Sequence, residues 1–421
     1  MRLVLVQVGI ICADLNRQLQ KRQISGAREC AEATALLLRK SIESFEDEDP
    51  NKLIIDIKCV ATRLIAAQPR ELTITNIVRR VLGIIRDELE QTGKTTLQSQ
   101  DYEVIVPPQE MSNTGESRQT SSLKGDTSDG QLSMFNLLSD SKQSDSTPMA
   151  SIRSAPPSLL QQPRLSENAS VSVKLDPDSK LEVIGGMEEL LDEIRQADDQ
   201  IAAYSTEQIH SREIILTNTL SAGVQKFLVK AAQRRRFSVI LVEGYPSSHR
   251  TIHEGANGKQ SNERNVSTHS QKTLTSHGVH ITVVPDSACF GLMARVSKVI
   301  LDARLVLANG SMICASGSQA IAVAAKQFQV PVLVLSAVYQ ISPEFPFDIN
   351  RFFDSARGVD LPVPDNKARH RIETQNPLYD HVPARLLDLY ITNLGGNAPP
   401  SLHRLINDHY RQEDRGPGNP F

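Results

Sequence analysis

The segment from Ser297 to Leu335 constrains the fold more than any other part of the chain. It reads SKVILDARLVLANGSMICASGSQAIAVAAKQFQVPVLVL. Val299–Leu301 and Val332–Leu335 are short apolar runs rich in β-branched residues, a pattern that indicates buried strands. The alanine-rich stretch Ser318–Gln327 between them favours a helix. A strand, a helix and a second strand in this order predict a parallel sheet covered by helices on both faces.

The same alternation extends upstream. Apolar runs at Ile214–Leu216, Ser238–Val242 and Ile281–Val284 are predicted strands, and Ser221–Arg234 is a predicted helix between the first two. Right-handed crossovers between such units give a Rossmann-like, doubly wound α/β domain. Binding sites in this architecture lie at the C-terminal ends of the strands.

The first hundred residues predict a helical domain, because apolar side chains recur there at three-four spacing. Gln68-Pro69 marks a break between helices, since a residue before proline avoids helical angles. A similar stripe predicts a long helix from Met187 to Tyr204, with the acidic Glu188 and Glu189 in its first turn. The N-terminal stripes are Ala35, Leu38, Ile42 and Phe45; Leu53, Ile57, Val60 and Leu64; and Val78, Leu82, Ile85 and Leu89.

Composition divides the chain into three parts. Residues 107–179 are dense in Ser, Thr, Asn, Gln, Asp and Pro and poor in aliphatics, so they are predicted to be disordered. We therefore expect an N-terminal helical domain at 1–106, a disordered linker at 107–179 and the Rossmann-like domain at 180–421. A polar insertion at 249–272 interrupts a strand-to-helix connection and is predicted to be a mobile surface loop.

The apolar run Leu3–Cys12 is the one segment that resembles part of a signal peptide. It is too short to span a bilayer. No clear cleavage site follows it, because Ala13 leads directly into Asp14. We expect it to be a buried first helix; a secretion signal and a misassigned start are the alternatives.

Charge and residue types exclude several classes of function. The formal net charge of -3, from 46 basic and 49 acidic residues, gives no general attraction to nucleic acid or to membranes. Trp is absent and aromatic residues make up 4%, which argues against base stacking. Five dispersed cysteines without a CxxC pair predict reduced thiols in a cytosolic protein. Histidine spacing indicates no metal site, and the absence of a dinucleotide or phosphate-loop motif indicates no cofactor.

Several segments together resemble one protein family. That family contains the regulatory alpha, beta and delta subunits of eukaryotic translation initiation factor 2B and, among its relatives, sugar-phosphate isomerases. The Asn309-Gly310 turn, which tolerates positive φ, is typical of it. The other segments that carry the resemblance are Ala66–Pro69, Asn76–Leu82, Ile214–Thr217, Val284–Ala288, Ser342–Phe347, Tyr379–Pro383 and Ile391–Pro399.

The resemblance also implies that catalysis has been lost. In the isomerases a Cys follows the first strand, and an Asp that transfers protons stands five residues before the Asn of the Asn-Gly turn. The corresponding residues here are Thr219 and Arg304, and an Asn-Lys pair of the isomerases is replaced by Cys314-Ala315. A Thr hydroxyl without a base beside it is a poor nucleophile, and an Arg cannot accept a proton at neutral pH. An isomerase of methylthioribose-1-phosphate or ribose bisphosphate is therefore the weaker alternative.

The function implied by the resemblance is that of a regulatory, non-catalytic subunit in the guanine nucleotide exchange factor for initiation factor 2. Such a subunit helps to form the core that binds initiation factor 2 and senses its phosphorylation. The implied partners are the alpha, gamma, delta and epsilon subunits and initiation factor 2 itself, in the cytosol, without direct contact with nucleic acid or membrane.

Two further sites are expected from the sequence. The predicted helix N-terminus at Gly317 and Ser318 is a candidate vestigial anion site, with simple helix capping by Ser318 as the alternative. The segment that contains Asn393, Gly395, Gly396 and Asn397 is a candidate subunit interface, because the glycine pair permits a tight turn. The alternative there is that the segment caps the domain's own sheet.

Overall fold

The computed structural model describes residues 2–24, 26–47, 49–100, 177–243, 263–352, 355–356 and 376–415. Most of the predicted linker and the first part of the predicted insertion lie outside these ranges. Residues Met1–Ser99 and Val173–Phe421 form one compact unit. No helix in the described ranges is long and apolar enough to cross a membrane.

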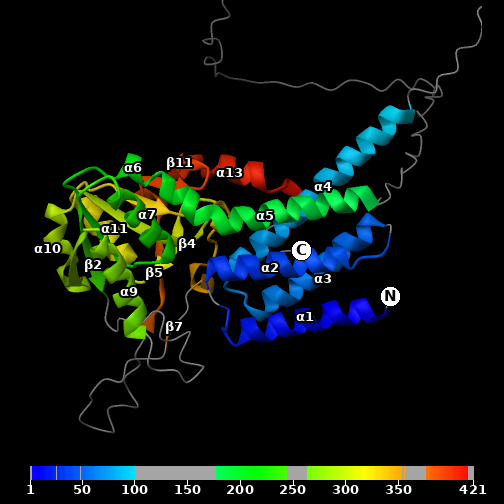
Figure 1. Cartoon of the computed structure of the whole chain (residues 1–421), viewed down its shortest axis with the longest axis horizontal. Coiled ribbons are helices and arrows are strands. Elements are labelled where there is room, and N and C mark those ends of the chain that lie inside the picture. Colours follow the sequence, from blue (N-terminus) through cyan, green and yellow to red (C-terminus); the bar gives the residue numbers. More distant parts are fainter. Residues whose placement is uncertain are drawn as a thin grey trace, which may run out of the picture. The chain divides into compact units, whose positions relative to one another are not determined.

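A bundle of helices forms one part of this unit (Figure 1). The predicted apolar stripes produce its core, since Leu38, Ile57 and Leu82 are fully buried. The first helix is also anchored, with Leu19 packed in the core beside Cys30. The bundle helices are α1 (Arg2–Gln20), α2 (Ala27–Glu43), α3 (Pro50–Ala67), α4 (Leu72–Gln100) and α5 (Pro177–Ala203).

Helix α5 begins at Pro177 and not at Met187 as predicted, so Glu188 and Glu189 lie in its middle. The reason is that the glycine pair before Met187 does not end the helix. Gly186 instead faces α4, where an added Cβ would lie 2.9 Å from Cγ2 of Ile84. The glycines therefore mark a close approach of two helices, which the sequence pattern alone does not distinguish from a helix break.

The sheet has the order β11-β10-β6-β4-β1-β2-β3. Neighbouring strands are parallel except β10 and β11. The predicted Rossmann-like α/β class is thus confirmed, with all five predicted strands present. The strands are β1 (Ile214–Thr217), β2 (Ser238–Glu243), β3 (His280–Pro285), β4 (Lys298–Val306), β6 (Val332–Leu335), β10 (Leu389–Thr392) and β11 (Gly395–Asn397).

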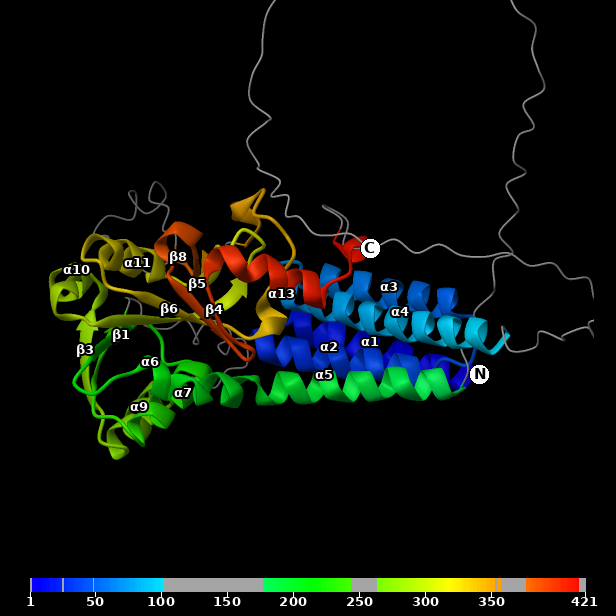
Figure 2. The same cartoon turned by 90° about the horizontal axis from the view of Figure 1, so that it is seen from above.

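Helices cover both faces of the sheet, as Figure 2 shows. Successive residues of a strand point to opposite faces. Leu333 accordingly belongs to the core cluster that includes residues of α5, α7 (Ala222–Ala232) and α9 (Glu263–Ser276), while Val334 belongs to the cluster that includes residues of α11 (Ser318–Gln327). The prediction of a surface loop at 249–272 is wrong for residues 263–272, because they are helical and belong to α9.

A second, antiparallel extension makes the sheet mixed and was not predicted. After the Asn309-Gly310 turn the chain returns as β5 (Met312–Ala315), which pairs with β4 and with β9 (Tyr379–Val382). Gly310 has φ of 76° and lies against Pro399, so only glycine fits this turn. The short elements include α6 (Ser205–Gln208), α10 (Cys289–Leu292), α13 (Leu402–His409), β7 (Ser355–Ala356) and β8 (Asn376–Pro377).

The helical bundle and the sheet share one core. Ile77 of α4 and Leu335 of β6 belong to the same cluster of buried side chains. Polar bonds add to this contact, since Asn76 Nδ2 donates to the carbonyl of Tyr339 at 3.1 Å and Arg79 Nε donates to that of Asp414 at 2.9 Å. The proposed division at residues 106 and 180 stays a prediction.

Candidate functional site

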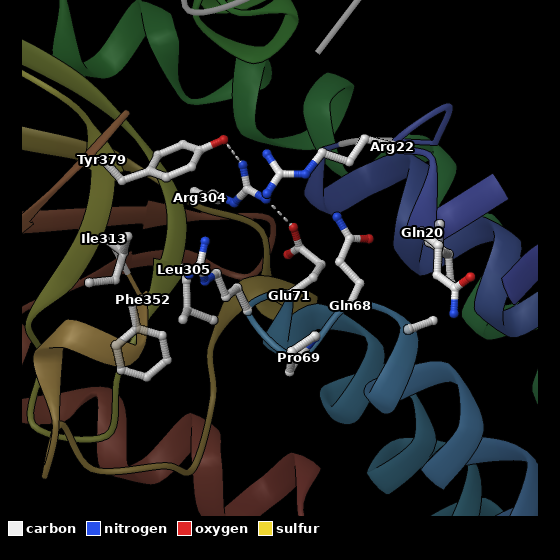
Figure 3. Close-up of a pocket in the computed structure, with 13 residues that line it drawn as sticks. Gln20, Arg22, Gln68, Pro69, Glu71, Arg304, Leu305, Ile313, Phe352 and Tyr379 are labelled. Atoms are coloured by element: carbon white, nitrogen blue, oxygen red, sulfur yellow. Dashed lines mark hydrogen bonds and ion pairs between the residues drawn. The ribbon is translucent and has the colours of Figure 1, made fainter. Parts of the chain in front are cut away.

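A cavity of about 310 Å³ lies where the start of α4 meets strands β4, β5 and β9 (Figure 3). It contains Arg304, one of the two positions at which the family resemblance implies a lost catalytic group. Both polar and apolar side chains line it. Its lining residues are Leu19, Gln20, Arg22, Ala67, Gln68, Pro69, Arg70, Glu71, Arg304, Leu305, Ile313, Phe352 and Tyr379.

Arg304 is held by two residues that are distant in the sequence. Its Nη2 lies 2.5 Å from Oε2 of Glu71, and its Nη1 donates to the hydroxyl of Tyr379. The guanidinium carbon also lies 4.2 Å from the centre of the Tyr379 ring, a cation–π arrangement. Glu71 is buried and accepts a further hydrogen bond from Thr73 Oγ1 at 2.9 Å. The guanidinium therefore serves as a structural cation.

Asp302, two residues before Arg304 on β4, is a carboxyl group that the sequence reasoning missed. Burial raises the pKa of Asp302 to about 7, and the charge of Asp198 adds to this rise. A hydrogen bond with Ser221 acts in the opposite direction and lowers the pKa. Asp198 is itself paired with Arg28, whose Nη1 lies 2.9 Å from its Oδ2. The signal was an acidic residue directly after the apolar run Val299–Leu301, since a carboxyl group within a buried strand is rare and has a perturbed pKa.

Thr219 gives this site no nucleophile. It lies half-buried in the β1–α7 connection, and its carbonyl accepts a hydrogen bond from Thr217 Oγ1 at 3.1 Å. Arg304 is bound by Glu71 and Tyr379, so it offers Thr219 a fixed charge and no general base.

The predicted anion site at the start of α11 already holds a carboxylate of the chain. The N–H groups of Gly317 and Gln319 donate to Oδ2 of Asp380 at 2.7 and 3.2 Å. Ser318 is not the cap, because its hydroxyl donates to the carbonyl of Ala315 at 2.6 Å. Asp380 thus accepts the hydrogen bonds that the sequence analysis assigned either to a bound anion or to a cap from Ser318. It was missed because it lies 63 residues from Gly317 in the sequence.

The cysteines contribute no reactive group here. All five are free thiols, and Cys289 and Cys314 are buried. Burial raises the pKa of Cys314 to about 12, so it packs as a neutral side chain. Within the described ranges, no three Asp, Glu, His or Cys side chains are grouped so that they could bind a metal.

The predicted interface segment is divided between the interior and the surface. Asn393 is 7% exposed; its Oδ1 accepts from the N–H of Val338 at 2.9 Å and its Nδ2 donates to Glu193 at 3.3 Å. Asn397 is also turned inward, since its Nδ2 donates to the carbonyl of Gly395 at 3.2 Å. The surface of the turn is formed by Gly396 and by Leu394, which is 55% exposed. Asn393 is therefore a structural residue within this chain.

Comparison with known proteins identifies a family for most of the chain. The model of the "Initiation factor 2 subunit family" matches residues 23–399. The translation initiation factor eIF2B subunit beta of Schizosaccharomyces pombe is 31% identical over 404 residues, which cover 96% of both chains.

Two crystal structures from Chaetomium thermophilum have the same fold. The structure of eIF2B beta is 29% identical, covers 98% of this chain and 96% of its own, and gives a TM-score of 0.64. A chain of the tetrameric eIF2B-beta2-delta2 complex is 27% identical, covers 96% of this chain and 95% of its own, and gives a TM-score of 0.60.

Proposed function

The chain belongs to the initiation factor 2 subunit family, and we propose that it acts as a regulatory subunit of beta type in the exchange factor for translation initiation factor 2. The similarity to a beta subunit over nearly the full length of both chains carries this proposal. The subunit is non-catalytic. Arg304, in the place of a proton-transferring Asp, is bound to Glu71 and cannot accept a proton.

The proposed direct partner is a delta subunit. A chain of the tetrameric beta2-delta2 complex has the same fold as this chain, which supports a similar assembly. The alpha, gamma and epsilon subunits and initiation factor 2 complete the proposed set of partners. In this assembly the chain would help to form the core that binds initiation factor 2 and senses its phosphorylation. The free cysteines are in keeping with a cytosolic location.

We place one contact surface of this assembly at the outer edge of the sheet. Strand β11 lies at that edge and pairs only with β10 among the described strands, so its outer backbone groups are available to another chain. Leu394 is exposed beside it, and an exposed apolar side chain at a sheet edge favours protein contact. Gly396 lacks a side chain and permits a close approach there.

Co-expression tests the proposal. A tagged form of this chain, produced with the alpha, gamma, delta and epsilon subunits of one organism, should purify with delta in equal amounts. The purified assembly should accelerate release of GDP from initiation factor 2, while this chain alone should not. A chain that remains alone at micromolar concentrations of delta, or that isomerises pentose phosphates above background, would contradict the proposed function.

A further inference from the structure

Three residues far apart in the sequence meet at one point between the bundle and the sheet. Glu71 precedes α4, Arg304 is on β4 and Tyr379 begins β9. We propose that these residues form a latch, here called the Glu71 latch, that holds the α3–α4 connection against the sheet and controls access to the core of the bundle beneath it.

The burial of Glu71 makes the closed state the favoured one. Its side chain is 2% exposed, and Arg304, the cation that lies 2.5 Å from it, comes from the sheet. Moving the connection away would leave a buried carboxylate without its cation, or would require it to regain water. This ion pair thus couples the connection to the sheet, in addition to the apolar cluster that Leu72 forms with Leu305 and Ile313.

The surroundings allow the latch to open. Arg304 is 21% exposed and borders the cavity of about 310 Å³, so its side chain has space beside it. In the connection itself, Pro69 and Arg70 are exposed while Glu71 is buried. A short exposed segment that is pinned on one side can detach locally without unfolding the helices that flank it.

Cys30 is a natural reporter of this opening. It is fully buried on α2, and its Sγ lies 3.8 Å from Oε1 of Gln68 in the connection. Burial, together with Glu71, raises the pKa of Cys30, whereas Arg304 lowers it. Removal of Arg304 would therefore slow alkylation of Cys30 through charge alone, because less thiolate would be present. Opening of the latch would accelerate alkylation, so the two effects have opposite signs.

The experiment measures alkylation of the full chain by N-ethylmaleimide under native conditions, with each cysteine quantified by mass spectrometry. Exposed Cys59 provides the internal reference and buried Cys314 reports global unfolding. In Arg304→Gln, Cys30 should react about tenfold faster relative to Cys59. Tyr379→Phe, which removes only the hydroxyl bond and keeps the ring, should give a smaller increase. If the assembly with delta is needed for solubility, the same assay applies to it.

Arg195→Gln is the matched control, because it removes an ion pair with Glu32 at 2.8 Å that lies at the bundle surface. This variant should leave the Cys30 rate unchanged. An unchanged or slower Cys30 rate in Arg304→Gln would overturn the latch. An equal acceleration of Cys314 would overturn it as well, because the triad would then support only global stability.

Discussion

Asp380 caps helix α11 from a distant strand: its Oδ2 accepts the N–H of Gly317 at 2.7 Å. Gly317 adopts φ of 90°, a left-handed conformation that aims its N–H at the carboxylate. A helix N-terminus favours negative charge, so a carboxylate from β9 stabilises α11 and also joins the two elements. In this chain a side chain of the sheet therefore occupies the helix N-terminus where an anion was expected.

Substitution of Asp380 by Ala should lower the free energy of unfolding by about 1–2 kcal/mol, the usual cost of losing a side-chain cap. A thermal melt measures the effect. Asp408→Ala serves as the control, since Asp408 is exposed on α13. Equal melting of the two variants would contradict a capping role for Asp380.

The regular part of the fold could be predicted from the sequence, because burying one face of a helix or strand repeats apolar residues at a regular spacing. The strand Ile214–Thr217 and the helix Ala222–Ala232 lie within two residues of the predicted Ile214–Leu216 and Ser221–Arg234. Strands β5 and β9 were missed because short antiparallel strands carry little periodicity of their own. Their pairing depends on a contact between segments that are far apart in the sequence.

The candidate site could be predicted only in part for the same reason. The loss of the isomerase residues was read from single positions, Thr219 and Arg304. The partner of Arg304 could not be predicted in this way, since Glu71 lies 233 residues away in the sequence. Asn393 was predicted to belong to a subunit interface, with a cap on the chain's own sheet as the alternative, and its side chain satisfies buried groups of the chain.

The glycine pair in α5 allows a direct test of the close helix approach. Gly186→Ala should destabilise the protein by about 1–3 kcal/mol, because the added Cβ would lie 2.9 Å from Ile84 Cγ2 in a packed core. Gly185→Ala is the matched control. No atom lies within 4 Å of its added Cβ, so it should be neutral or stabilise the helix by about 0.5–1 kcal/mol. Denaturant unfolding of both variants measures the difference, and the reverse order would show that α4 and α5 do not meet there.

Gly396→Val separates a role in the interface from a role in the fold. A Cβ at this position would lie 3.6 Å from Cδ1 of Leu389, an ordinary contact, so the thermal melt should change little. Capture of a delta subunit in a co-expression pull-down should fall, because a valine side chain beside β11 would obstruct the close approach proposed at this sheet edge. Gly395→Ala is the comparison, since its φ of 120° makes any side chain costly to the fold itself. Normal capture by Gly396→Val would remove β11 from the proposed interface.

The raised pKa of Asp302 predicts how stability depends on pH. Its carboxyl has a pKa of about 7 in the folded chain and an ordinary value of 3.8. Between these values the folded state holds a proton that the unfolded state has released, so the contribution of Asp302 to stability falls as pH rises from about 4 to about 7. Asp302→Asn, which cannot ionise, should melt close to the wild type at pH 4 and above it at pH 8. Thermal melts over this range measure the gap, and a constant gap at all pH values would mean that Asp302 titrates alike in both states.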